Sequence, residues 1–234
     1  MITLAFLFMF VLAGYYILNL PIWKIKEVVV NGTRILSAEE IKALAGIPLS
    51  ENLFFTSFSR ARSNLGKIPG IKQARFYRIP PATVLISITE RRPVATVVFP
   101  RKSVIIDEEG YILNRNPNIS LNIPNLADLP VITGISEEAL SSDRIEGEAA
   151  QVISHILSKL ARFLESRRLQ LELGGLENVS FLLDDLLRVR VGDTEQVKRK
   201  MEVFEALLPQ IEGRWPQVEY MDVRFPDNPV IKFK

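Results

Sequence analysis

The first 23 residues of the chain, Met1 to Trp23, carry no charged side chain. A helix rises about 1.5 Å per residue, so about 20 apolar residues cross a bilayer core of about 30 Å. Met1–Leu20 has that length, and Pro21 ends the run because a helix usually stops before a proline. A buried core helix of this length normally keeps a polar face, and a cleaved signal peptide has a basic start and a small-residue cleavage site. The sequence therefore favours a single-pass membrane anchor.

Charge is divided unevenly along the rest of the chain. Lys24–Lys102 has 14 basic and 5 acidic residues, whereas Ser103–Lys234 has 15 basic and 22 acidic residues. This asymmetry predicts two modules with different surfaces. A basic module beside the membrane would be attracted to anionic headgroups, but an ordinary solvated surface explains the pattern equally well. Nucleic-acid binding needs clustered Lys and Arg with interleaved aromatic residues, so we expect no nucleic-acid partner.

The amino-acid composition excludes most catalytic mechanisms. The chain has no cysteine and one histidine, His155, which excludes cysteine nucleophiles, thiolate metal sites and multi-histidine metal sites. The acidic triplet Asp107–Glu109 indicates a solvated turn rather than a cation site, and the adjacent Asp184 and Asp185 indicate a strand turn rather than an acid–base pair. His155 is expected on a helix surface. With no nucleotide-binding or hydrolase motif, we expect no enzyme activity, no metal and no cofactor.

The first module, expected over residues 24–95, reads as strand, helix, helix, strand, strand. Ser37 and Glu40 have the form of a capping box that opens a short helix, and a second helix is predicted over 57–67. The predicted strands are rich in β-branched or alternating apolar residues and cover 25–30, 71–78 and 83–90. The residues expected in the core, from helical or strand spacing, are Phe58, Ala61, Leu65, Val84, Ile86 and Ile88.

The second module, expected over residues 96–234, reads as a larger, mostly antiparallel β domain with flanking helices. Apolar runs predict strands over 96–99, 103–106, 111–113, 169–173, 179–183, 187–191, 218–225 and 230–233. Helices are predicted over 148–164 and 195–208, the second capped by Thr194. The apolar stripe of the first helix is Val152, Ile153, Ile156, Leu157, Leu160 and Leu164. Residues 114–130, rich in Asn and Pro, read as a loop.

Several stretches of both modules resemble the FtsQ/DivIB family of bacterial cell-division proteins. In the first module, the element order and the stretches Ile68–Arg75, Arg78–Pro81 and Glu90–Ala95 are similar to the POTRA domain of that family, although Gly70 and Ile71 replace a common aromatic residue and valine. In the second module, the stretches that resemble the family's β domain are V-I-I-D-E-E-G-Y-I-L, L-P-V-I-T-G, V-G-D-T-E-Q-V-K-R-K-M-E-V-F-E-A-L-L-P and V-E-Y-M-D-V-R-F. Asp222 and Arg224 carry the last match, and Phe225 replaces a common tyrosine. The resemblance covers nearly the whole chain.

The resemblance implies an α+β chain with a transmembrane helix over 1–23, a POTRA domain over 24–95 and an FtsQ-type β domain over 96–234. It places the N-terminus inside, both modules outside the cytoplasmic membrane, and the protein at the division septum. The positive-inside rule alone, applied to Lys24 and Lys26 after the span, would place the modules in the cytoplasm, although a basic tail ahead of the apolar run would change that count.

The resemblance also implies a function, that of a non-enzymatic divisome scaffold. Its expected partners are FtsB- and FtsL-like bitopic proteins, with other divisome proteins binding through the POTRA domain. The alternative is a POTRA-bearing accessory for protein transport or secretion, which would receive many unfolded strands rather than one fixed partner.

The candidate binding site is the final predicted strand, Val230–Phe233, which follows Pro226 and Pro229 and is expected at an open sheet edge. An edge strand presents unpaired N–H and C=O groups to which another strand can add. By resemblance, FtsQ proteins hold FtsB in this way, with FtsL alongside. The residues that would carry the contact here are Arg224, Phe225, Val230, Ile231 and Phe233. The competing interpretation is that their apolar side chains belong to the core.

Overall fold

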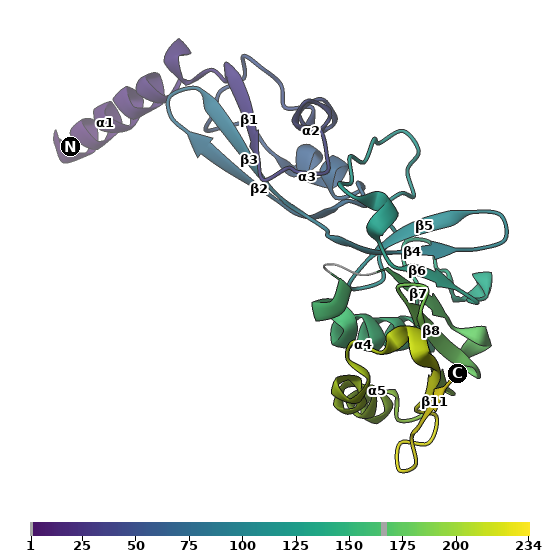
Figure 1. The fold of residues 1–234 in the computed structure, drawn as a ribbon. Helices are drawn as coiled ribbons and strands as arrows, with labels where there is room; N and C mark the ends of the chain where they lie inside the picture. Colours follow the sequence, from purple (N-terminus) through teal and green to yellow (C-terminus); the bar gives the residue numbers. More distant parts are fainter. Residues whose placement is uncertain (1, 165–167) are drawn as a thin grey trace. The chain divides into compact units, whose positions relative to one another are not determined.

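The computed structural model describes residues 2–164 and 168–234 and divides into two compact units (Figure 1). Unit 1 comprises residues 1–91 and 116–122, and unit 2 comprises residues 92–115 and 123–234. The segment 116–122 joins unit 1 through tertiary contacts. Ile119 and Leu121 pack against the core of unit 1, and the N–H of Asn122 donates to the carbonyl of Ile35 at 2.9 Å.

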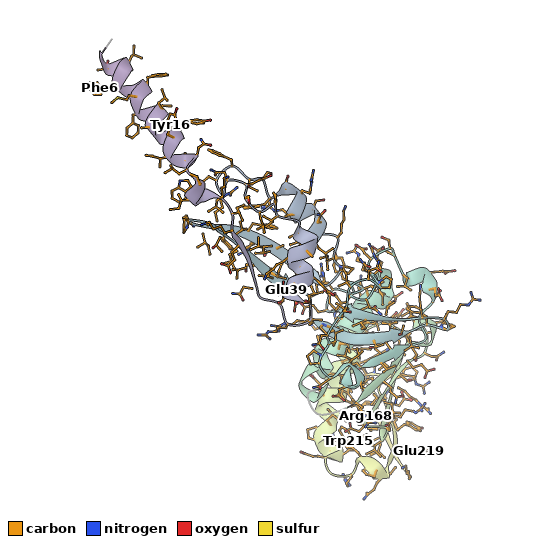
Figure 2. All side chains as sticks on the ribbon, turned by 90° about the horizontal axis from the view of Figure 1, so that it is seen from above. Phe6, Tyr16, Glu39, Arg168, Trp215 and Glu219 are labelled. Carbon is orange, nitrogen blue, oxygen red and sulfur yellow. The ribbon has the colours of Figure 1, made fainter. Side chains whose placement is uncertain are left out.

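Unit 1 begins with α1 (Ile2–Leu18) and the short 3-10 helix η1 (Pro21–Trp23). The side chains of α1 project outward, as Phe6 and Tyr16 show in Figure 2, and its large apolar side chains are exposed along its length. Among the described residues, no helix combines the length and the apolar character that a membrane crossing requires. α1 itself has 17 residues.

The body of unit 1 is a three-stranded sheet with two short helices. Its elements are β1 (Glu27–Asn31), α2 (Ala38–Ala45), α3 (Ser59–Leu65), β2 (Ile71–Ile79) and β3 (Thr83–Glu90). The strand order is β1-β3-β2, with β1 parallel and β2 antiparallel to β3. The predicted β-α-α-β-β order is therefore confirmed.

Most of the secondary structure and core of unit 1 follows from short sequence patterns. The Ser37 hydroxyl accepts a hydrogen bond from the N–H of Glu40, which confirms the predicted cap of α2. The core residues predicted from spacing, Phe58, Ala61, Leu65, Val84, Ile86 and Ile88, are all buried. α3 is shorter than the predicted 57–67, because the Ser57 hydroxyl accepts the N–H of Ser59 and holds the preceding chain in a turn.

Unit 2 is built on an eight-stranded sheet. Its strands are β4 (Pro93–Val98), β5 (Ser103–Asp107), β6 (Val131–Thr133), β7 (Leu169–Glu172), β8 (Val179–Leu183), β9 (Leu187–Gly192), β10 (Val218–Asp222) and β11 (Val230–Phe233), in the order β11-β10-β9-β8-β7-β6-β4-β5. Within the described chain, four neighbouring pairs of this sheet are antiparallel and three are parallel. The sheet is thus mixed: antiparallel pairs are in the majority, as predicted, but the parallel pairs were not predicted.

Two helices, α4 (Gly147–Leu164) and α5 (Val197–Leu207), cover the same face of this sheet (Figure 1). The predicted stripe of α4 is buried from Val152 to Leu160, and the side chain of Leu164 lies outside the described residues. Phe181 on β8 and Phe204 on α5 meet edge to face at 5.2 Å and join the sheet to the helix. The remaining short 3-10 helices are η2 (Leu126–Asp128), η3 (Glu137–Ala139), η4 (Gly174–Leu176), η5 (Leu208–Ile211) and η6 (Trp215–Gln217).

Three local expectations for unit 2 concern its turns and its helix surface. Residues 111–113 do not form a strand but two isolated bridges, one between Ile106 and Ile112 and one between Tyr111 and Arg144. The Asp107 carboxylate accepts the N–H groups of Glu109 and Tyr111 and tightens the turn. Asp184 and Asp185 form the predicted strand turn, with φ of 52° and 57°. His155 is exposed on α4, as predicted.

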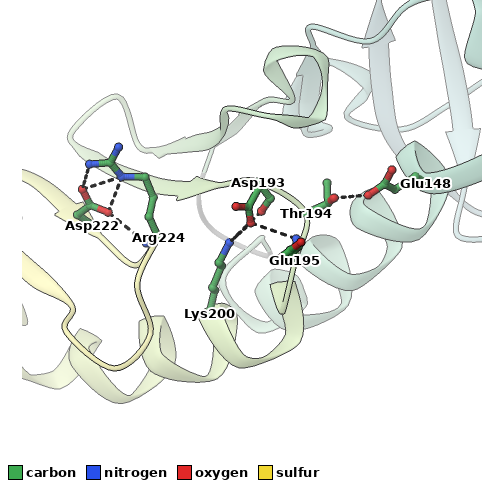
Figure 3. Close-up of polar contacts among 7 residues, drawn as sticks. All are labelled: Glu148, Asp193, Thr194, Glu195, Lys200, Asp222 and Arg224. Atoms are coloured by element: carbon green, nitrogen blue, oxygen red, sulfur yellow. Dashed lines mark hydrogen bonds and ion pairs between the residues drawn. The ribbon is translucent and has the colours of Figure 1, made fainter.

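The predicted cap of the second helix is wrong. Gln196, with φ of 53°, is the residue before α5, and the Thr194 hydroxyl instead donates to the Glu148 carboxylate (Figure 3). α5 accordingly begins at Val197 and not at Glu195. Thr194 thus connects the segment before α5 to the first turn of α4.

Candidate partner-binding site

β11 is an edge strand of the eight-stranded sheet and, among the described strands, pairs only with β10. The N–H of Lys234 donates to the carbonyl of Gln217 at 2.9 Å, so this amide points toward β10. Backbone groups alternate in direction along a strand. The N–H and C=O groups of Ile231 and Phe233 therefore point to the open side of the edge.

The side chains along this edge are largely apolar and accessible. Phe225, Val230 and Phe233 are 67%, 51% and 44% exposed, whereas Ile231 is half-buried and packs against the core of unit 2. The Arg214 guanidinium lies 5.5 Å from the centre of the Phe233 ring. The interpretation of these side chains as core therefore applies to Ile231 alone.

Arg224 and Phe225 lie in the connection between β10 and β11, not in a strand. β10 ends at Asp222, so the predicted strand over 218–225 is too long. The chain turns there because the Asp222 carboxylate binds both the Arg224 backbone N–H at 3.1 Å and the Arg224 guanidinium, whose terminal nitrogen lies at 2.7 Å (Figure 3). This local pair positions Arg224 beside the start of β11.

The Asp222–Arg224 pair is held in its charged form. Partial burial raises the pKa of the Asp222 carboxyl, but hydrogen bonds from the Arg224 side chain and backbone, with the charges of Arg224 and Arg190, outweigh it. The pKa of Asp222 consequently lies below its ordinary value. The hydrogen bond and charge of Asp222 in turn raise the pKa of Arg224.

Gly192, the last residue of β9, makes room for Arg224. Its φ is 76°, a conformation that favours glycine, and a Cβ atom there would lie 2.8 Å from the Cγ atom of Arg224. The aliphatic stem of Arg224 therefore lies directly over the Gly192 backbone, which leaves no space for a side chain.

A basic groove on the open face of the sheet leads to Arg224. It has a volume of about 340 Å³ and is lined by Glu172, Gly174, Asn178, Val179, Ser180, Arg188, Arg190, Gly192 and Arg224. Arg188 and Arg190 alternate along β9 with the buried residues Leu187, Val189 and Val191. The Arg190 guanidinium also lies 4.0 Å from the centre of the Tyr220 ring. Such a groove can bind carboxylate side chains.

The groove was not predicted from the sequence. The alternation L-R-V-R-V over 187–191 is the sequence pattern from which its two arginines could have been identified. That pattern places both arginines on the face of β9 opposite the helices, where they have no core to join. We name the outward edge of β11, the turn residues Arg224 and Phe225, and this groove together the β11 site.

A second charged pair lies nearby and supports the fold. Lys200 on α5 is buried, and its Nζ atom binds the Asp193 carboxylate at 2.6 Å and the Asp193 carbonyl at 3.0 Å (Figure 3). The hydrogen bond from Lys200 lowers the pKa of the Asp193 carboxyl. Among the described residues, no group of three or more His, Asp or Glu side chains is arranged to hold a metal ion.

The β-α-α-β-β body of unit 1, followed by the mixed sheet of unit 2, defines a protein with a POTRA domain and a β domain. A family model described as "POTRA domain, FtsQ-type" matches residues 23–91, and one described as "Cell division protein FtsQ/DivIB, C-terminal" matches residues 96–224. The second match covers more than half of the chain. The chain belongs to the FtsQ/DivIB family of cell division proteins.

Individual relatives agree with this assignment. The chain is 25% identical to cell division protein DivIB of Clostridium tetani over 220 residues, which are 92% of this chain and 81% of that protein. It is 26% identical to cell division protein FtsQ of Streptomyces bingchenggensis over 89% of this chain and 76% of that one. The FtsQ protein of Syntrophotalea carbinolica is 27% identical over 94% of this chain and 77% of its own length. The resemblance identified from sequence motifs is thereby confirmed.

Proposed function

We propose that this chain is a non-enzymatic, membrane-anchored scaffold of the division machinery that holds an FtsB-like bitopic protein at the β11 site, with an FtsL-like protein alongside. The single observation that carries the proposal is the open edge of β11. There the N–H and C=O groups of Ile231 and Phe233 face away from β10. A partner strand added at this edge would gain main-chain hydrogen bonds.

The surroundings of the edge supply the specificity that strand addition needs. Val230, Phe233 and Phe225 offer exposed apolar surface next to the backbone. The groove lined by Arg190 and Arg224 would bind acidic side chains of a helix or turn that continues the partner strand. We therefore expect the partner segment to be apolar where it pairs with β11 and acidic beside it.

Anchoring in the membrane is assigned to α1. At about 1.5 Å per residue, its 17 residues extend about 25 Å, which is the lower limit of the length that a crossing takes, so the proposed span includes residues beyond the helix. The uncharged run continues from Asn19 to Trp23. Large apolar side chains are exposed at consecutive positions of α1, and therefore on all sides of the helix, which suits lipid and not water. In this proposal the N-terminus is inside, and both units lie outside the cytoplasmic membrane at the septum.

The proposal is tested by co-purification in mild detergent with FtsB- and FtsL-like proteins expressed from the same bacterium. The full chain should retain both proteins, and a chain ending at Asp227 should lose them, because it lacks β11. The thermal unfolding of the two forms shows whether unit 2 remains folded. Equal capture by both forms would place the site elsewhere. Recovery of many unfolded outer-membrane proteins instead would indicate a transport accessory.

A further inference from the structure

The loop Leu49–Phe55 of unit 1 is bonded to the C-terminal end of α1. The Asn52 side-chain amide donates to the carbonyl of Leu18 at 2.6 Å, and the N–H of Leu53 donates to the carbonyl of Trp23 at 2.8 Å. A further bond joins the N–H of Ile25 to the carbonyl of Glu51 at 2.8 Å. The helix end is thus joined to the POTRA body by direct hydrogen bonds.

This junction carries an unusual concentration of exposed apolar side chains. Ile22, Leu49 and Phe55 are 51%, 59% and 59% exposed, and Phe54 is 37% exposed. The Phe54 ring meets the Trp23 ring edge to face at 5.2 Å, and the Trp23 indole N–H donates to the carbonyl of Ile17 within α1. We call Ile22, Leu49, Phe54 and Phe55 the apolar rim. The rim is therefore continuous with the apolar surface of α1.

Two lysines and a further exposed apolar residue, Ile79, lie at the end of the unit 1 sheet that is next to this junction. Lys24 and Lys26 are exposed and flank the buried Ile25. The N–H of Lys26 donates to the carbonyl of Ala82 at 2.8 Å, which places the turn between β2 and β3 beside this segment. Ile79, at the β2 end of that turn, is 44% exposed. Aromatic rings with lysines next to them are typical of the membrane–water interface.

We propose that the apolar rim inserts into the interfacial layer of the bilayer that α1 crosses, and so holds unit 1 against the membrane. This inference rests on the proposed anchoring by α1. A lipid surface is the occupant, because the rim continues the apolar surface of α1, is bonded to the end of that helix, and is accompanied by exposed lysines that suit anionic headgroups. As a consequence, the POTRA body holds a fixed orientation against the membrane and does not swing about η1.

Because the chain has no cysteine, single cysteines can report the depth of chosen positions. The full chain is reconstituted in vesicles of phosphatidylcholine and phosphatidylglycerol, and a spin label is attached at Phe55→Cys or Leu49→Cys in the rim. Thr89→Cys is the matched control, since Thr89 is exposed and lies six residues along β3 from Thr83, about 20 Å away. Phe10→Cys reports on α1 itself.

We expect the labels at positions 49, 55 and 10 to collide more with oxygen, which concentrates in lipid, than with a water-soluble nickel complex. The label at position 89 should show the reverse. Rim labels as accessible to nickel as the label at position 89, with position 10 in lipid, would overturn this inference and leave the anchoring intact. A label at position 10 that is in water would overturn the anchoring and, with it, the insertion of the rim.

Discussion

The carboxylate of Glu90 accepts a hydrogen bond from the backbone N–H of Leu36 at 2.8 Å, although the two residues are 54 positions apart. The same carboxylate accepts the N–H groups of Arg34 and Ile35, both at 2.9 Å. The end of β3 therefore holds the segment that leads into α2. This gives a physical role to the glutamate of the Glu90–Ala95 motif, by which the sequence resembles the FtsQ/DivIB family.

Replacing Glu90 should loosen this segment. Glu90→Ala leaves three amides without their acceptor and should lower the free energy of unfolding of unit 1 by about 2 kcal/mol. Glu90→Gln keeps one acceptor oxygen and should cost less. Hydrogen exchange of the amides of residues 34–36 measures the effect, with the amides of β8 in unit 2 as an internal reference. Unchanged protection of residues 34–36 in Glu90→Ala would contradict this role.

Gly192→Ala should disturb the β11 site. The new Cβ would crowd the Cγ atom of Arg224 at 2.8 Å, in addition to the strain of φ at 76°. Gly213→Ala is the matched control, because its φ is 74° and no atom lies within 4 Å of the place that its Cβ would take. Backbone strain of about 1 kcal/mol is common to both variants. Only Gly192→Ala should also weaken partner binding, as measured by titration calorimetry, and equal binding by the two variants would contradict the prediction.

The Asp222–Arg224 pair predicts a dependence of stability on pH. Because the pKa of Asp222 is lowered in the folded chain, the pair stabilises the fold fully above the unfolded pKa of about 3.9. This contribution is lost as the pH falls through the lower folded pKa. Asp222→Asn should therefore be less stable than the wild type at pH 7 and show a shallower loss of stability below about pH 4. Thermal unfolding from pH 7 into the acid range measures the stability of both proteins. If the stability of the wild type and of Asp222→Asn fell in parallel below about pH 4, the pair would contribute nothing.

The basic groove predicts a charge effect on binding. Arg190→Gln removes one cation that lines the groove, and should weaken partner binding roughly fivefold, or about 1 kcal/mol. Lys198→Gln makes the same change of charge on α5, on the other face of the sheet, and should leave binding unchanged. Equal effects of the two variants would mean that only net charge matters and that the groove has no specific role.

Local patterns carried most of the successful predictions of the fold. The alternation in Thr83–Glu90 fixed which face of β3 is buried, and Ser37 with Glu40 marked the start of α2, because both signals act within a few residues. The position of Val230–Phe233 as a short strand was likewise predicted from its own residues, and the structure places that strand at a sheet edge.

The features that were missed depend on contacts distant in sequence or on side-chain bonds. The parallel pairing of β6 with β4 and β7 joins segments separated by a loop and a helix, so no local periodicity reports it. The early end of β10 depends on the hydrogen bonds between Asp222 and Arg224. The membership of residues 116–122 in unit 1 depends on the bond from Asn122 to Ile35.

The central claim, strand addition at β11, is tested most directly by comparing Ile231→Pro with Ile231→Ala in the full chain. Both variants lose the packing of Ile231, but only proline removes the N–H that points to the open side, and an edge strand tolerates proline there. We expect Ile231→Ala to keep most of its affinity for the extracytoplasmic part of an FtsB-like partner, and Ile231→Pro to lose about tenfold or more, about 1.4 kcal/mol. Equal affinities of two folded variants would contradict strand addition.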